Sequence, residues 1–212
     1  MSSAQVQEIL EEFKEKNPRN KIIAIRGLPG SGKTTLANLL GLPLELDELA
    51  LLKFIEDNPK DVLKKIAGKR FDPQKDDLRK FLFEYCIKTQ ATYKNFLEES
   101  NKYLTKNLGS EFAKRVRNKN GIIALDYSVL PDEISSSANL IIDVSADEIA
   151  RNNAFCDREK DILSAQQMKE KYNIIQEVEK PLLEKLIPAN LNFENEHGSI
   201  HKMHELAEEI SK

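Results

Sequence analysis

The sequence is poor in cysteine, lacks a long apolar run and carries no excess of positive charge. Cys86 and Cys156 are its two cysteines, and neither stands at metal-ligand spacing, so we expect reduced thiols in a cytoplasmic protein. The apolar runs are too short to cross a bilayer, and the N-terminus lacks the basic-then-apolar layout of a signal peptide. Because 32 basic and 35 acidic residues give a net charge of −3, no global basic field points to nucleic acid. We therefore expect neither a membrane nor a nucleic acid as a partner.

The chain has instead enough apolar residues for one compact core. Its 212 residues suit a single domain with an inserted lid or subdomain, and a hydrophobic share of 40% can fill the interior. Alternating strand and helix patterns favour a parallel sheet covered on both faces, which is a three-layer α/β fold. The predicted strands are 21–27, 42–46, 121–126, 138–144 and a weak 189–195, and the predicted helices include 4–16, 174–187 and 201–210.

Two stretches interrupt this alternation. Residues from about 68 to 118 keep helical spacing but are too long for a plain crossover, so we predict a helical insert that binds substrate. The aromatic residues of this insert are interpreted as core residues, with stacking on a substrate base as the alternative. The basic residues near its end, Lys114, Arg115, Arg117 and Lys119, are interpreted as a solvated helix end. The polar segment 151–173 is interpreted as a lid. We also expect Ser145 and Glu148 to form a capping box, and Pro181 to kink or divide its helix.

Residues 27–34, GLPGSGKT, fit the pattern G-x-x-x-x-G-K-[ST] between a predicted strand and a predicted helix. Glycines let backbone N–H groups approach phosphate oxygens, and the helix adds its positive end. Lys33 supplies a charge for the β- and γ-phosphates, and the Thr34 hydroxyl completes a Mg²⁺ shell. The pattern therefore predicts binding of a nucleoside triphosphate with Mg²⁺. The expected binding residues in the loop are Gly27, Pro29, Gly30, Ser31, Gly32, Lys33, Thr34 and Thr35.

Three carboxylates stand at or near predicted strand ends. Asp47 could accept a proton from an acceptor hydroxyl or hold Mg²⁺ through water, and it could equally be the N-cap of a following helix. Asp126 ends its strand where many P-loop proteins keep a metal-facing aspartate, whereas Asp143 is interpreted as structural. Because ligands of parallel sheets lie at the carboxyl ends of the strands, the glycine loop, Asp47, Asp126 and Asn195 are expected to converge on one cleft.

Two arginines and three histidines are further candidates for the site. The guanidinium groups of Arg151 and Arg158 could close over the phosphates and spread the developing charge. Arg151 is interpreted as a solvated surface residue, while both interpretations stay open for Arg158. His197, His201 and His204 have no acidic or thiol partner at ligand spacing, so they are interpreted as surface histidines and not as metal ligands.

The phosphate loop and several later segments resemble the dephospho-coenzyme A kinase family. GLPGSGKTTLANLLG followed by LELDELA is similar to that family's loop, helix and acidic segment. PLLEKLIPANLNFEN at 181–195 and KDDLRKFLF at 75–83 are similar to its closing strand and its substrate half. The resemblance spans about residues 22–200. It places Asp47 on the family's catalytic aspartate and Asn195 on the asparagine at the nucleotide end.

The chain also departs from the family's pattern. The His-Pro pair of the insert is absent, and Pro-Leu-Leu after the third strand appears as Ser128-Val129-Leu130. Glu179 replaces a glutamine before Pro181, and Asn190 stands where the family has aspartate. Residues 1–20 have no counterpart and are interpreted as an N-terminal amphipathic helix ahead of a kinase domain at 21–212.

The resemblance implies an ATP-dependent kinase that phosphorylates the ribose 3′-hydroxyl of dephospho-coenzyme A in coenzyme A biosynthesis. It implies that Asp47 orients or deprotonates that hydroxyl and that Lys33 and Arg158 stabilise the transferring phosphoryl group. Thr34 and Asp126 would hold Mg²⁺, and Asn195 would lie along the adenine. The alternatives are another nucleoside or nucleotide kinase, or a degenerate nucleotide-binding module. A nucleotide switch is disfavoured, because the sequence lacks the switch motif Asp-x-x-Gly after the third strand.

Overall fold

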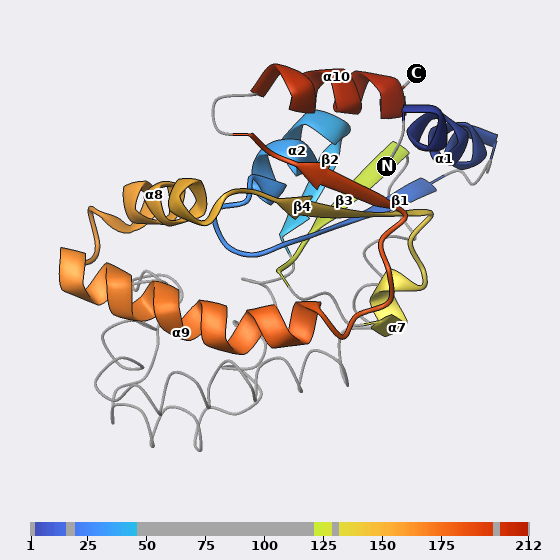
Figure 1. The fold of residues 1–212 in the computed structure, drawn as a ribbon. Coiled ribbons are helices and arrows are strands. Elements are labelled where there is room, and N and C mark those ends of the chain that lie inside the picture. The colour runs from blue at the N-terminus through green and yellow to red at the C-terminus, as the bar shows by residue number, and fades with distance from the viewer. Residues whose placement is uncertain (1–2, 16–19, 46–120, 129–131, 197–199, 212) are drawn as a thin grey trace, which may run out of the picture.

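The computed structural model describes residues 3–15, 20–45, 121–128, 132–196 and 200–211. The predicted helical insert at about 68–118 lies outside the described residues, and so does Asp47. The part of the chain that the structure describes forms one five-stranded parallel sheet with helices on both faces (Figure 1). The described residues therefore confirm the predicted fold class, which is a three-layer α/β P-loop NTPase fold with a parallel sheet.

The strand order places the first strand at the centre of the sheet. The order is β2-β3-β1-β4-β5, and each neighbouring pair is parallel. The chain fills one side of β1 and then crosses to the other, so a topological switch point lies at the carboxyl end of β1, where ligands bind in such sheets. The strands are β1 (Asn20–Arg26), β2 (Leu42–Glu45), β3 (Gly121–Asp126), β4 (Leu140–Ser145) and β5 (Leu191–Glu194).

The helices divide between the two faces of the sheet. Helices α1, α2 and α10 pack on one face, and α7 and the long α9 lie on the other, while α8 extends from the carboxyl end of β4 (Figure 1). Within the described ranges, each helix is too short or too polar to span a lipid bilayer. The helices are α1 (Ser3–Glu15), α2 (Lys33–Leu40), α7 (Asp132–Ser135), α8 (Glu148–Glu159), α9 (Ala165–Leu183) and α10 (Ile200–Ser211).

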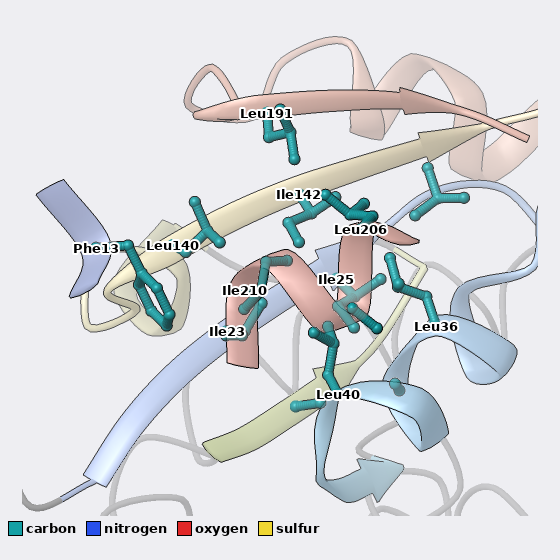
Figure 2. Packing of buried hydrophobic residues seen from close by; sticks show 14 of the residues in the cluster. Phe13, Ile23, Ile25, Leu36, Leu40, Leu140, Ile142, Leu191, Leu206 and Ile210 are labelled. Atoms are coloured by element: carbon teal, nitrogen blue, oxygen red, sulfur yellow. The ribbon is translucent and has the colours of Figure 1, made fainter. Parts of the chain in front are cut away.

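The larger core lies between the sheet and the layer of α1, α2 and α10. Alternate strand residues such as Ile23 and Ile25 point into it, as the period of two in a strand requires. Figure 2 shows them meeting Leu36 and Leu40 of α2 and Ile210 of α10. Each fully buried side chain of this size contributes about 1.5–3 kcal/mol of hydrophobic free energy. This packing fixes α2, and with it the phosphate loop, against the central strand.

The second core lies on the opposite face of the sheet. Ala24, Ile123 and Leu125 point into it from the central strands. Leu182 at the end of α9 and Ile187 after it pack against this group. The end of α9 is therefore held against this face of the sheet.

Two local features differ from the sequence-based expectation. The cap of α8 is Asp147, whose side chain accepts hydrogen bonds from the N–H groups of Ile149 and Ala150, so the predicted capping box of Ser145 and Glu148 is wrong. Strand β4 runs through Ser145, which leaves the next turn to make the cap. Pro181 does not divide its helix, because α9 continues to Leu183. Proline removes one hydrogen bond there, in the last turn, where the helix is ending in any case.

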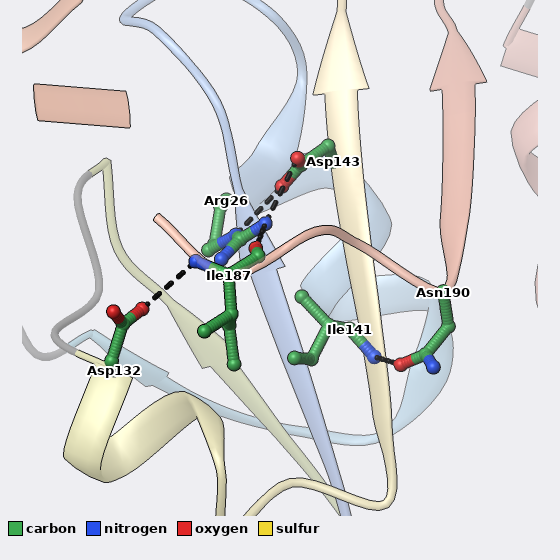
Figure 3. A network of polar contacts seen from close by, with 6 residues as sticks. All are labelled: Arg26, Asp132, Ile141, Asp143, Ile187 and Asn190. Atoms are coloured by element: carbon green, nitrogen blue, oxygen red, sulfur yellow. Dashed lines mark hydrogen bonds and ion pairs between the residues drawn. The ribbon is translucent and has the colours of Figure 1, made fainter. Parts of the chain in front are cut away.

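One side-chain amide and one carboxylate form hydrogen bonds that hold loops in place near the sheet. The amide oxygen of Asn190 accepts from the N–H of Ile141 at 2.8 Å, which aligns the start of β5 with β4 (Figure 3). Asp132 likewise accepts from the N–H of Ile187 at 3.0 Å, which ties α7 to the loop after α9. Asn190, the residue that replaces the family's aspartate, thus has a structural contact in this chain.

Candidate nucleotide site

The phosphate loop joins β1 to α2, and its backbone adopts conformations that glycine permits. Gly30 and Gly32 have φ values of 80° and 100°, in a region that residues with a Cβ atom rarely adopt. A Cβ on Gly30 would lie 2.2 Å from the carbonyl oxygen of Arg151, and one on Gly32 would lie 2.8 Å from Nδ2 of Asn195. Gly32 is also the N-cap of α2. The loop and the positive end of α2 therefore form a cradle that suits a phosphate chain.

Lys33 and Thr34 begin α2 and face the carboxyl end of the sheet. Lys33 is buried, and its Nζ donates to the carbonyl oxygen of Leu28 at 3.3 Å. The Thr34 hydroxyl donates to Oδ2 of the buried Asp126 at 2.5 Å, which connects the loop to the end of β3. A hydroxyl beside a carboxylate is a ligand set that suits Mg²⁺, which keeps several waters and takes its other oxygens from phosphates. Of the other predicted loop residues, Gly27 and Pro29 are buried and Thr35 is exposed.

The described residues hold no dense metal-binding cluster of the kind that zinc requires. No group of three or more histidine, cysteine, aspartate or glutamate side chains stands together among them. His201 and His204 are exposed on α10, in agreement with their interpretation as surface residues, and His197 lies outside the described residues. The arrangement of Thr34 and Asp126 therefore fits a metal that arrives with a nucleotide better than a metal caged by protein.

Asn195 follows β5 directly and contacts the phosphate loop. Its side-chain N–H donates to the carbonyl oxygen of Ser31 at 2.9 Å, and its backbone N–H donates to Ser145 at 2.7 Å. The hydroxyl oxygen of Ser31 is buried and has no hydrogen-bond partner in the part of the chain that the structure describes. The structure thus brings Asp126, Asn195 and the glycine loop together at one edge of the sheet.

Arg151 is buried, and its interpretation as a solvated surface residue is wrong. Its Nε donates to the carbonyl oxygen of Ala146 at 3.1 Å, and its Nη1 donates to Oε1 of Gln176 at 2.9 Å. These contacts join α8 to α9, and the backbone of Arg151 lies directly against Gly30. The hydrogen bonds to a carbonyl and an amide compensate for burial of the guanidinium group. Arg151 therefore holds α8 against the phosphate loop at Gly30.

Arg158 lies one helical turn beyond Phe155 on α8, and 44% of its side chain is exposed. Its guanidinium group lies 5.4 Å from the centre of the Phe155 ring, and Nε pairs with Glu159 at 3.1 Å. Glu159 also forms a buried ion pair with Lys171 of α9 at 2.8 Å. The two helices are thus tied by a charged network, at the edge of which the Arg158 head group stays accessible to solvent.

Glu179 lies near the loop and was not among the candidate site residues taken from the sequence. It lies on α9, and Ser128 forms a hydrogen bond with its carboxyl group. Burial raises the pKa of Glu179 to about 7, although the positive charges of Lys33 and Arg158 and the hydrogen bond from Ser128 act in the opposite direction. Its Oε2 atom is buried without a hydrogen-bond partner among the described residues. The available signal in the sequence was an acidic residue on the same helix as the buried residues Ile175 and Val178.

Asp143 has the structural role that the sequence suggested. Its two carboxylate oxygens accept from Nε and Nη2 of Arg26 at 2.7 and 2.9 Å (Figure 3). The same Nη2 donates to the carbonyl oxygen of Ile187 at 2.9 Å. Arg26 is 1% exposed, so removing Asp143 would leave a buried charge unpaired, which is strongly destabilising. The pair holds the end of β1 to β4 and to the chain after α9.

Comparison with known proteins supports the fold. No model of a known protein family matches the chain, and no curated protein matches it. It is similar to the crystal structure of TT1252 from Thermus thermophilus, with a TM-score of 0.56 at 22% identity, covering 90% of this chain and 96% of that one. A weaker similarity is to shikimate kinase from Acinetobacter baumannii in complex with shikimate, with a TM-score of 0.41 at 14% identity, covering 90% of each chain. Another is to deoxyadenosine kinase from M. mycoides with bound dATP, with a TM-score of 0.40 at 12% identity, covering 87% of this chain and 96% of that one. At these identities the likeness extends to the fold and not to the activity.

Proposed function

We propose that this protein is a kinase that transfers the γ-phosphoryl group of ATP to a hydroxyl group, with Mg²⁺. The observation that supports this most directly is the contact of Thr34 with Asp126 beside the buried Lys33. Gly30 and Gly32 let the backbone of the loop pack closely against Arg151 and Asn195, in conformations that a Cβ atom would obstruct. The charge, the oxygen ligands and the backbone cradle that a bound ATP·Mg²⁺ requires are therefore all present at one site.

In this proposal the chain acts by positioning and by charge, because phosphoryl transfer needs little covalent help from a protein. Lys33 and Arg158 stabilise the negative charge of the transferring group, and Asn195 lies beside the nucleotide. Thr34 and Asp126 hold Mg²⁺, which when bound neutralises part of the charge of the triphosphate. Segment 151–173, which comprises most of α8 and the start of α9, acts as a lid that excludes water.

The acceptor that we propose is the ribose 3′-hydroxyl of dephospho-coenzyme A. Support comes from the resemblance of the loop, the LELDELA segment and the closing strand to dephospho-coenzyme A kinases. The test is a panel of hydroxyl acceptors with ATP·Mg²⁺, including dephospho-coenzyme A, nucleosides and nucleotides, followed by phosphorus NMR of the products. Phosphorylation of dephospho-coenzyme A in preference to the others supports the proposal. Preference for a nucleoside or nucleotide would assign another acceptor, and no transfer at all would indicate a binding module.

Asp47 is proposed as the group that orients or deprotonates the acceptor hydroxyl. Asp47→Asn should then lower turnover by roughly a hundredfold or more, in line with the ~10²–10⁴ contribution of a general base. ATP affinity should stay unchanged, because the phosphates rest on residues 27–34. If Asp47 is only a helix cap, asparagine caps nearly as well, and turnover and thermal stability should both stay near those of the parent protein. Turnover above about a tenth of the parent value would remove Asp47 from catalysis.

A further inference from the structure

Glu179 is connected to the phosphate loop through Ser128. The carbonyl oxygen of Ser128 accepts from the N–H of Gly27 at 3.4 Å, and the same residue hydrogen-bonds the Glu179 carboxyl group. Ser128 itself is buried, two residues beyond Asp126. Lys33 and Arg158 lie close enough to Glu179 for their charges to act on it. The carboxyl group is therefore near Ser128, which contacts the start of the glycine loop, and within electrostatic range of Lys33.

One carboxyl oxygen of Glu179 is left without a partner. Ser128 supplies one hydrogen bond, while Oε2 is buried and has no partner among the described residues. A buried polar atom in this condition costs free energy, because it has lost its water and gained no hydrogen bond in exchange. Nearly all buried polar atoms in native proteins are satisfied, and exceptions call for a specific reason. Beside a predicted phosphate site, that reason is a ligand.

The chemistry of a carboxylate limits what this ligand can be. Phosphate oxygens are negative acceptors, so an ionised carboxylate repels them and forms no hydrogen bond with them. Where Glu179 is ionised, the partner of Oε2 donates, and the donors that a kinase site would bring beside Lys33 are an O–H group of the second substrate or a water held by Mg²⁺. A substrate hydroxyl is favoured, because the oxygen ligands for Mg²⁺ stand together elsewhere, at Thr34 and Asp126.

We propose that Glu179 contacts the phosphoryl acceptor, with Oε2 accepting a hydrogen bond beside Lys33 from an O–H group of the acceptor other than the hydroxyl that is phosphorylated. This inference rests on the proposed kinase function and adds a substrate contact to it. Glu179 also replaces the glutamine of the family that the sequence resembles. A glutamine side chain presents one acceptor and one donor, whereas an ionised glutamate presents two acceptors. The site in this chain is thus built for a partner with O–H groups.

The test is Glu179→Gln, which keeps the shape of the side chain and removes its charge. The matched control is Glu184→Gln, because Glu184 is exposed at the end of the same helix. In Glu179→Gln, kcat/KM for the acceptor should fall about tenfold or more, as expected for loss of a hydrogen bond to a charged group. The KM for ATP and the concentration of Mg²⁺ for half-maximal activity should stay at parent values, and Glu184→Gln should match the parent in every measurement.

Three results would overturn the inference. If Glu179→Gln matches the parent while the parent phosphorylates its acceptor, only this inference fails and the kinase proposal stands. If the main effect is a higher Mg²⁺ requirement with an unchanged acceptor KM, then Oε2 serves a metal-bound water instead. If the parent transfers phosphate to no hydroxyl in the panel, the kinase proposal fails and the inference fails with it. Circular dichroism and thermal unfolding of each variant confirm that a loss of activity is not a loss of fold.

Discussion

At the scale of single residues, the atoms around the phosphate loop divide into satisfied and unsatisfied groups. Arg151 and Asn195 use their side chains to hold the loop in place. Ser31 Oγ, Gln176 Nε2 and Glu179 Oε2 are buried with no hydrogen-bond partner in the described part of the chain. Two of these, Gln176 and Glu179, lie three residues apart on α9 and therefore on one face of that helix. Ser31 lies on the loop itself, whereas the fourth buried atom without a partner among the described residues, Nη1 of Arg26, belongs to the ion pair with Asp143.

The raised pKa of Glu179 predicts how stability depends on pH. Because its pKa is about 7 in the folded protein and 4.5 in an unfolded chain, its stabilising contribution is complete below pH 4.5 and is lost as the pH rises through 7. Glu179→Gln removes this loss, so at pH 8 the ligand-free variant should be more stable than the parent by up to about 3 kcal/mol, at 1.36 kcal/mol per pKa unit. At pH 4.5 the two should be equally stable.

Urea denaturation of the parent and of Glu179→Gln at the two pH values measures the difference directly. The exposed Glu184→Gln variant serves as the control at both values, and it should follow the parent. A variant that is less stable than the parent at pH 8 would contradict a buried, unsatisfied carboxylate at this position. A gain in stability together with a loss of turnover would identify Glu179 as a residue kept for function at a cost in stability.

At the scale of elements, α8 and α9 form a helical pair that approaches the loop from the β4 side. Asp147 caps the first helix, and Ser164 with Gln167 forms a reciprocal capping box on the second. The pair is tied internally by Lys171 and Glu159. These contacts fix the packing of the two helices against each other.

We expect segment 151–173 to close when both substrates are bound. Amide hydrogen exchange across this segment should slow in the presence of an ATP analogue and acceptor together, as exchange does in lids that close over substrates. Helix α1, which packs on the far face of the sheet, is the internal control and should exchange at the same rate in both states. Unchanged exchange across 151–173 at saturating ligand would mean that α8 and α9 are a static part of the fold.

At the scale of the whole molecule, the sequence predicted the sheet and the loop because both depend on local patterns. Short β-branched runs gave β1, β3 and β4, and the glycine pattern gave the turn before α2. The strand order was beyond reach, since it depends on contacts between residues far apart in the chain. The same limit explains the misjudged Arg151, whose partner Gln176 lies 25 residues away. Glu179 was missed because only the folded chain brings α9 beside Lys33.

The central claim is that residues 27–34 hold the phosphates of ATP, and it is tested most directly by titration of the parent and of Lys33→Ala with ATP·Mg²⁺ in a calorimeter. Lys14→Ala, which removes an exposed lysine from α1, is the matched control. The account predicts that Lys33→Ala stays folded and loses affinity by roughly thirtyfold or more, the loss expected when one partner of a buried charge pair is removed. The control should bind like the parent. Equal ATP·Mg²⁺ affinity in the parent and in a folded Lys33→Ala variant would contradict the assignment.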